Sequence, residues 1–262
     1  MLVEPVFTGK VDNLVISVYQ TNQAMGFAAA QEANDLLIQT LHRKALANII
    51  LASANSQLTL LAALSEIEGI DWSRVNVFHM DEYVGLDLGH PASFSRFLQK
   101  HFLEYIHPAA FFPVLGQAQD VECTCLEYQT LLYNYPADLC VLGFGENGHL
   151  AFNDPPFADF HDLSWVKVVH LDDRSRKQQV GEGHFEHFVD VPTQAITLTI
   201  PALLAASRIL AVVPEARKAE AVENALLGPI QEGCPASVLR RVSHAHLYLD
   251  LESAARVYHL FN

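Results

Sequence analysis

The sequence predicts an α/β fold: a single three-layer α/β/α domain over residues 1–262, Rossmann-like, with a mainly parallel sheet. Apolar strand-like stretches alternate with helical patterns along the whole chain, which is typical of parallel sheets with right-handed crossovers. The apolar stretches at 49–51 and 139–142 are also continuous, as expected for strands covered on both faces. No linker, repeat or low-complexity tract divides the chain, which favours one domain.

The individual elements follow from local patterns. Thr21 or Asn22 is a suitable N-cap for the first long helix, and Pro91 suits the first turn of another. We expect strands at 13–19, 49–52, 75–80, 137–142, 165–171, 195–200, 209–213 and 246–249. We expect helices at 21–46, 57–67, 91–106, 121–133, 174–180, 201–206, 216–227, 236–241 and 253–259.

Composition excludes several classes of partner. The net charge is −14, from 16 Lys+Arg and 30 Asp+Glu, which disfavours nucleic acid and anionic membranes. No apolar run approaches the roughly 20 residues of a membrane span, and the N-terminus does not resemble a signal peptide. The four cysteines form no C-x-x-C pair, so we expect reduced thiols in a cytoplasmic protein.

The most informative segment runs from the apolar stretch 139–142 to a double proline at 155–156. Gly143, Gly145 and Gly148 allow sharp turns and a close approach of the backbone to a ligand. His149 supplies an imidazole, the side chain most suited to acid–base work at physiological pH, and Asp154 follows five residues later, where it could orient the imidazole. This arrangement is typical of a small-molecule active site, although a glycine turn with a surface histidine is the simpler alternative.

The three glycines also satisfy the dinucleotide pattern G-x-G-x-x-G. That pattern requires a helix to begin at the third glycine. Here the prolines follow seven and eight residues after Gly148, and proline inside a helix costs about 3 kcal/mol. We therefore expect no nicotinamide or flavin cofactor.

In parallel α/β folds, ligands bind at the carboxyl ends of strands. This rule selects three loops, at 53–57, 79–89 and 143–156. The second contains adjacent carboxylates, Asp81 and Glu82, which are either a solvated loop or a general base with its neighbour.

Two of these loops together resemble the glucosamine-6-phosphate deaminase (isomerase) family, within the broader group that includes 6-phosphogluconolactonase. The matching segments are Met80-Asp81-Glu82-Tyr83-Val84-Gly85-Leu86 and the glycine turn that leads to His149 and Asn153. A weaker resemblance extends over residues 10–250 and includes the stretch 195–199 and Lys218.

The resemblance implies a metal-free and cofactor-free conversion of glucosamine 6-phosphate to fructose 6-phosphate and ammonia. Asp81 would take the C2 proton and return it to C1, and His149 would handle the proton at the ring oxygen. Asp154 would replace a glutamate of the family that orients the histidine. An aldose–ketose shift requires such acid–base groups and no redox cofactor.

The same resemblance suggests the residues that hold the substrate. Lys218 matches a phosphate-binding lysine of the family. The family's glycine-rich phosphate loop corresponds to a glycine-free stretch here, in which Ser53, Asn55 and Ser56 are candidates. Three further candidates are Glu82, Gly145 and Gly148. The family's phosphate arginine has no clean match, and Arg174, Arg176 and Lys177 are the nearby cations.

Asn147 departs from the family, which has an aspartate before the Gly-His pair. An amide can orient an imidazole but does not stabilise its positive charge. We therefore include Asn147 among the catalytic candidates and keep two alternatives: a 6-phosphogluconolactonase-like hydrolase and a non-catalytic sugar-phosphate sensor. The expected partner is a small-molecule sugar phosphate, with neither nucleic acid nor membrane involved, and assembly into a homo-oligomer is left open.

Overall fold

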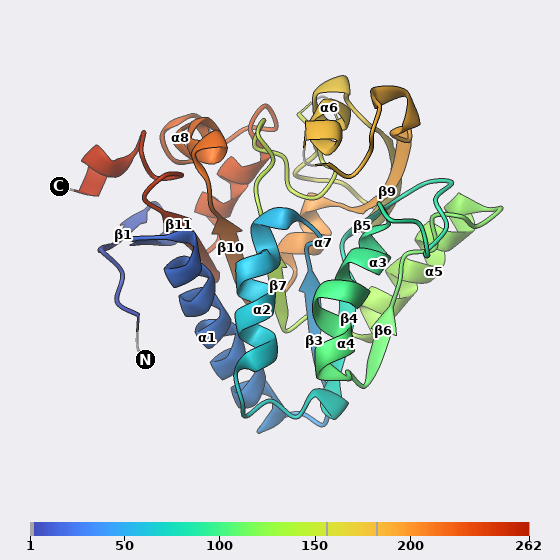
Figure 1. Cartoon of the computed structure of the whole chain (residues 1–262), viewed down its shortest axis with the longest axis horizontal. Coiled ribbons are helices and arrows are strands. Elements are labelled where there is room, and N and C mark those ends of the chain that lie inside the picture. Colours follow the sequence, from blue (N-terminus) through green and yellow to red (C-terminus); the bar gives the residue numbers. More distant parts are fainter. Residues whose placement is uncertain (1–2, 156, 182, 262) are drawn as a thin grey trace.

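A large mixed sheet forms the centre of the molecule in the computed structural model, which describes residues 3–155, 157–181 and 183–261 (Figure 1). Its strand order is β1-β2-β11-β10-β7-β3-β4-β6. All neighbours are parallel except β1 and β2, so the predicted mainly parallel sheet is confirmed. The strands are β1 (Phe7–Val11), β2 (Leu14–Tyr19), β3 (Ala47–Leu51), β4 (Val75–His79), β6 (Ala110–Phe112), β7 (Leu139–Leu142), β10 (Ile209–Val213) and β11 (Ala245–Asp250).

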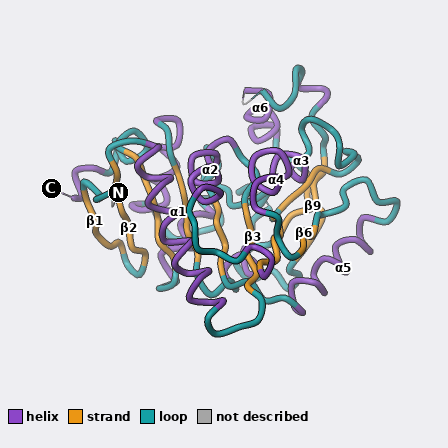
Figure 2. Tube along the Cα trace, turned by 60° about the horizontal axis from the view of Figure 1, so that its bottom comes forward, coloured by secondary structure: helices purple, strands orange, loops and turns teal. Residues whose placement is uncertain are grey.

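Helices cover both faces of this sheet, giving the three layers seen in Figures 1 and 2. Alternate residues of one strand enter different cores: Leu139 and Val141 pack on one face, Cys140 and Leu142 on the other. The first face is covered by α1 (Asn22–Leu41), α2 (Leu58–Glu66), α3 (Phe94–Leu98) and α4 (Glu104–Ile106). The second is covered by α5 (Val121–Asn134), α7 (Ile200–Leu204) and α8 (Ala219–Leu227).

A second, antiparallel sheet with the order β5-β9-β8 stands beside the first. It consists of β5 (Asp81–Tyr83), β9 (Gln194–Leu198) and β8 (Val166–His170), and α6 (Asp173–Gly181) follows β8. The sequence pattern predicted β8 and β9 as strands but did not predict that they form a separate antiparallel sheet. The third hydrophobic cluster, which includes Tyr83, Phe152 and Phe185, packs against this small sheet.

Several boundaries also differ from the prediction. The short strands β1, β5 and β6 were not predicted, because stretches of three to five residues carry little periodicity. The helix expected from Pro91 begins only at Phe94, because the Ser93 hydroxyl accepts the Arg96 backbone N–H as an N-cap. A π-helical turn at Gln99–Leu103 then separates α3 from α4. The expected helix at 253–259 is mostly turns.

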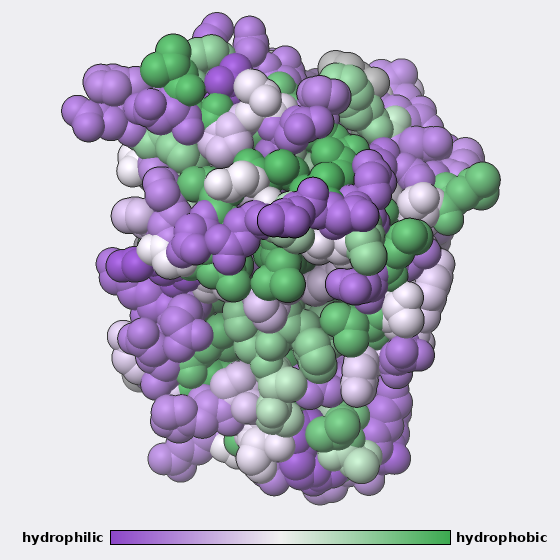
Figure 3. All heavy atoms as spheres, turned by 90° about the vertical axis from the view of Figure 1, so that its right-hand side faces the viewer, coloured by the Kyte–Doolittle hydropathy of each residue, from purple (hydrophilic) through white to green (hydrophobic). Residues whose placement is uncertain are grey.

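Hydrophobic and hydrophilic residues are mixed on the side of the molecule that carries α5 (Figure 3). Leu126 and Tyr133 on α5 are 64% and 50% exposed. Among the described residues, no helix is both long and apolar enough to span a membrane.

Candidate active site

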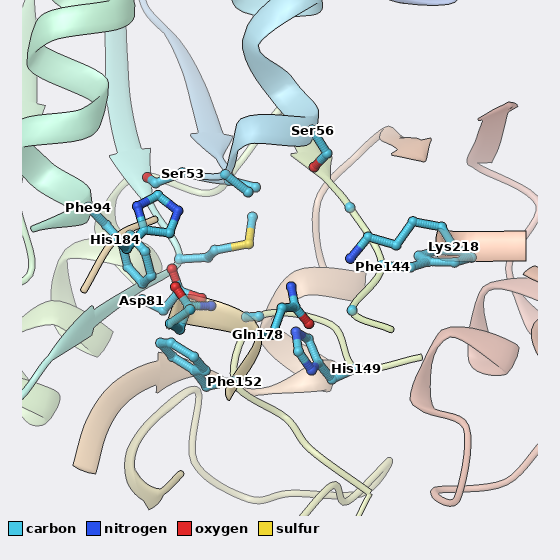
Figure 4. Close-up of a pocket in the computed structure, with 17 residues that line it drawn as sticks. Ser53, Ser56, Asp81, Phe94, Phe144, His149, Phe152, Gln178, His184 and Lys218 are labelled. Carbon is cyan, nitrogen blue, oxygen red and sulfur yellow. The ribbon is translucent and has the colours of Figure 1, made fainter. Parts of the chain in front are cut away.

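A cavity lies at the carboxyl ends of β3, β4, β7 and β10, where the sheet rule places ligands. It encloses about 590 Å³ of space between atoms, part of which is open to solvent. Six predicted site residues line it: Ser53, Ser56, Asp81, Gly145, His149 and Lys218. In Figure 4, Asp81 and Lys218 reach the cavity from opposite sides, and His149 lies below them.

Asp81 is the first residue of β5, one residue after β4 ends. Its side chain lines the cavity and is largely buried, and its carboxyl group forms no hydrogen bond within the described residues. Burial, with a smaller contribution from the negative charge of Glu82, raises the pKa of Asp81 to about 8. A carboxyl group with this pKa can both accept and return a proton near neutral pH.

Glu82, a predicted substrate-binding residue, does not line the cavity, and this prediction is corrected. Consecutive residues of a strand point to opposite faces, so Glu82 turns away where Asp81 turns inward. Its fully buried carboxyl group accepts bonds from the Ser93 hydroxyl at 2.7 Å and from the backbone of Tyr83, Phe94 and Ser95. Glu82 therefore fixes the start of α3.

His149 and Asp154 form an ion-pair geometry, as the sequence predicted, with 2.9 Å between Nδ1 and Oδ1. Asp154 is fully buried behind the imidazole, and its Oδ1 also accepts from the Ser175 hydroxyl at 2.6 Å. Burial disfavours the charged carboxylate, but bonds from His149, Ser175 and Asn147 outweigh it and hold the pKa of Asp154 below its usual value. A carboxylate at Nδ1 retains a proton there and leaves Nε2 for chemistry.

Asn147 acts on Asp154 and not on the imidazole. Its Nδ2 donates to Asp154 Oδ1 at 2.8 Å, while its Oδ1 accepts the backbone N–H of His149 at 3.0 Å. Asn147 is absent from the cavity lining. The amide therefore does not contact the ring directly, as we expected from the sequence, but holds the carboxylate that contacts the ring.

The glycine turn has two distinct requirements. At Gly145 a Cβ atom would lie 2.3 Å from the His149 ring, so the imidazole occupies the space that a side chain would fill. Gly148 has a φ of +82°, and a Cβ atom there would lie 2.8 Å from Cys234 Sγ. It does not line the cavity, which corrects its assignment to substrate binding. No helix follows the turn among the described residues up to β8, so the helix N-terminus that the dinucleotide pattern requires is missing from this part of the chain; Pro156 lies outside these residues.

Ser53, Ser56 and Lys218 provide polar groups for an anion. The Ser53 hydroxyl is buried and forms no hydrogen bond within the described residues. Ser56 lies in the 3-10 turn Asn55–Gln57 that leads into α2, and the N-terminal end of a helix favours an anion. Lys218 is 3% exposed and sits at the start of α8, following a turn in which Glu215 N–H binds Asp250. Asn55 lines a neighbouring pocket, not this cavity.

Of the alternative cations near α6, those whose side chains the structure describes do not line the cavity. The Arg176 guanidinium donates to the carbonyls of Phe188 and Val191 and stacks 4.1 Å from the centre of the Phe188 ring. Lys177 is exposed outside the cavity lining, and the side chain of Arg174 lies outside the described part of the chain. Lys218 is thus the only lysine or arginine among the described residues that line the cavity.

Sequence reasoning missed several residues of the site. Ser175, Gln178, Gln179 and His184 come from α6 and the segment after it, and Phe94 and Phe152 supply apolar walls. Their sequence carries no motif; only the tertiary position of α6 over the glycine turn reveals them. Within residues 3–155, 157–181 and 183–261, no group of three or more His, Cys, Asp or Glu is placed to hold a metal ion.

Comparisons with known proteins identify relatives of this chain. The family model of glucosamine-6-phosphate isomerases/6-phosphogluconolactonase matches residues 20–248. A glucosamine-6-phosphate deaminase of Bacillus thuringiensis (strain Al Hakam) is 36% identical over 205 residues, which is 78% of this chain and 75% of the relative. A glucosamine-6-phosphate deaminase of Bacillus cytotoxicus is also 36% identical, over 203 residues.

Two solved structures have the same fold. A monomeric glucosamine-6-phosphate deaminase superposes with a TM-score of 0.85 at 29% identity, covering 92% of this chain and 99% of its own. A 6-phosphogluconolactonase from Shewanella baltica OS155 superposes with a TM-score of 0.76 at 20% identity, covering 92% of this chain and 100% of its own. The second likeness concerns the fold alone.

Proposed function

Because this chain belongs to the family of glucosamine-6-phosphate isomerases and 6-phosphogluconolactonases, we propose that it deaminates and isomerises glucosamine 6-phosphate to fructose 6-phosphate and ammonia. The observation that carries the proposal is the pair of acid–base groups in one cavity. Asp81 has a carboxyl pKa raised to about 8, and His149 is held by a buried carboxylate. A lactone hydrolase has no need for a base over C2.

The proposed reaction uses these groups in sequence. His149 Nε2 protonates the ring oxygen as the sugar opens. Loss of the anomeric hydroxyl proton at the same time gives the open-chain C1 aldehyde. Asp81 then takes the C2 proton, the electron pair of that C–H bond forms the C1=C2 double bond of an enolamine, and the C1 oxygen regains a proton. Return of the proton to C1 gives an imine at C2, and water hydrolyses the imine to the ketone with release of ammonia. The Asp154 carboxylate positions the imidazole throughout.

Lys218, with Ser53 after β3 and Ser56 in the turn that leads into α2, would hold the phosphate. In a protein with a net charge of −14, a buried lysine and helix N–H groups reverse the field locally, where the anionic substrate must bind. We further place the reaction in the cytoplasm, because all four cysteines are free, as in a reducing compartment.

A coupled assay tests the proposal. The purified protein is given glucosamine 6-phosphate, and both fructose 6-phosphate and ammonia are measured; equal yields of the two products are expected. 6-Phosphogluconolactone is offered in parallel, with the change in its spontaneous hydrolysis as the measurement. Acceleration of lactone hydrolysis without ammonia release would replace the proposed function with the lactonase alternative. Binding without either reaction would favour the sensor.

A further inference from the structure

The loop that leads from β10 to Lys218 contains a residue with a strained backbone. Glu215 has a φ of +79° and a ψ of 142°. The other described non-glycine residues with a positive φ have values of 48–50°, in the left-handed region that side chains can adopt. The angles of Glu215 lie outside that region and close to a conformation that is essentially restricted to glycine. Such a conformation lowers stability and persists only where surrounding contacts impose it.

Two contacts hold Glu215 in this conformation. Its backbone N–H donates to both carboxylate oxygens of Asp250, at 3.1 and 3.3 Å. The Asp250 carboxylate is buried and is itself fixed by the backbone N–H of Ser253 at 2.8 Å. At the other end of the residue, the Glu215 carboxylate accepts a hydrogen bond from Arg217 Nε. The 3-10 turn that follows ends at Lys218, whose side chain lines the catalytic cavity.

A second ion pair links this loop to the glycine turn. The Arg217 guanidinium, which binds Glu215, also lies 3.6 Å from Glu146 Oε1. Glu146 precedes His149 by three residues in the glycine turn. We call these three charged side chains the loop bridge, because they join the loop that carries Lys218 to the loop that carries His149. Each is about a third exposed, so the ion pairs of the loop bridge add little to stability.

We infer that Glu215 is a positioning residue, which acts through its strained backbone and the loop bridge to hold Lys218 where the phosphate of the substrate binds. Glycine would adopt the same backbone conformation freely, so folding alone gives no reason for a glutamate here. What glycine lacks is the carboxylate that binds Arg217. A loop that is ordered before the ligand arrives binds it more tightly, because less conformational freedom is lost on binding. The inference rests on the phosphate-binding role given to Lys218 in the proposed function.

The variant Glu215→Gly distinguishes positioning from two simpler roles. It keeps the backbone N–H that binds Asp250, relieves the strain and removes the carboxylate. We expect the melting temperature to rise by about 2–4 °C. In contrast, calorimetry should show the affinity for inorganic phosphate falling by about three- to tenfold. A purely electrostatic role predicts tighter phosphate binding, because a negative charge is lost near the anion. A purely structural role predicts a lower melting temperature.

The variant Glu146→Ala tests the far end of the loop bridge. It should also weaken phosphate binding, although it too removes a negative charge. Because loss of either carboxylate breaks the same connection, the double variant Glu215→Gly/Glu146→Ala should bind phosphate as Glu215→Gly does, within about twofold. Losses that multiply in the double variant would show that the two carboxylates act separately, and would overturn the role of the loop bridge.

His107→Gly is the matched control. His107 has a φ of +48°, is exposed at the end of α4 and does not line the cavity. Its replacement should likewise raise the melting temperature, through relief of the positive φ, and should leave phosphate affinity unchanged. An equal loss of phosphate affinity in this control would show that the effect of Glu215→Gly is not specific to the loop of Lys218, and would overturn the inference.

The inference and the proposed function fail separately, because inorganic phosphate carries no sugar. Phosphate affinity in Glu215→Gly that equals or exceeds that of the parent protein would overturn the inference, and so would a parent protein that binds no phosphate. A weaker affinity in the variant, with no ammonia release by the parent protein, would support the positioning role and refute the deaminase. Ammonia release together with an unchanged phosphate affinity in the variant would refute the positioning role alone.

Discussion

Gly145 provides a direct test of how closely the glycine turn is fitted to His149. In Gly145→Ala, the new Cβ would lie 2.3 Å from two ring atoms, whereas ordinary contacts begin at 3.4 Å, so the imidazole must move by about 1 Å. The turn cannot easily yield, because Gly145 N–H donates to the His149 carbonyl at 2.9 Å and Gly148 N–H donates to the Gly145 carbonyl at 3.0 Å. A misplacement of this size reduces turnover by about 10²-fold.

The variant should also lose about 1–3 kcal/mol of unfolding free energy through overpacking. Gly181→Ala is the matched control: it adds the same methyl group at the end of α6, where no atom lies within 4 Å. The measurements are kcat and KM in the fructose 6-phosphate assay together with urea unfolding. We expect a loss of kcat with little change in KM for Gly145→Ala and no effect for the control. A Gly145→Ala protein that keeps more than a third of the parent kcat would refute the fit described here.

Three further variants test the other groups. Asp81→Asn should reduce kcat by about 10²-fold or more with binding retained. It should also raise the melting temperature, and by more at pH 9 than at pH 5. The raised pKa of the Asp81 carboxyl means that the parent protein loses stability as the pH rises from 3.8 toward about 8, and the amide does not have this cost. An increase in melting temperature over the parent protein that is the same at both pH values would contradict this linkage. Lys218→Ala should chiefly raise KM for the sugar phosphate, and an unchanged salt dependence of KM would remove it from the phosphate site. Asn147→Asp should destabilise the protein by about 1–3 kcal/mol and lower kcat, because a carboxylate oxygen replaces the amide donor that lies 2.8 Å from Asp154 Oδ1. A higher kcat in this variant would contradict the role given to the Asn147 amide.

The sequence predicted most of the parallel sheet and the acid–base groups, because both depend on short-range patterns. Apolar runs define strands such as β3 and β7, and strand ends place Asp81 and His149 at one edge of the sheet. The sequence did not reveal the features that depend on the register between paired strands. Whether Asp81 or Glu82 faces the cavity depends on the pairing of Asp81 with Thr197 in β9, a residue more than a hundred positions away.

The contribution of α6 was unpredictable for a related reason. The cations on this helix were candidate phosphate ligands, yet the Arg176 guanidinium donates hydrogen bonds to loop carbonyls instead. Its neighbour Ser175, a residue without any motif, donates to Asp154. Which side of a polar helix meets the glycine turn is decided by packing between distant segments, and neither hydrophobic periodicity nor charge reveals it.

The small antiparallel sheet has a consequence for how the site can change. Asp81 belongs to this sheet, and Leu198 N–H donates to the Met80 carbonyl just before it. The His149 loop is tied to the same sheet, through Phe152 N–H to the Thr197 hydroxyl and the Asn153 amide to the Leu198 carbonyl. Ser53, Ser56 and Lys218, by contrast, follow strands of the large sheet.

The groups proposed for proton transfer therefore follow strands of the large sheet but are also tied to the small sheet, whereas the groups proposed for anchoring the phosphate follow the large sheet alone. A substitution in the loops of the large sheet could exchange the anchored end of the ligand while the spacing between acid and base stays fixed. Reshaping of the small sheet would have the opposite effect. The architecture thus permits the loops that anchor the ligand to change while the small sheet holds the acid and the base in place, which is how one scaffold can diversify without rebuilding its reactive centre.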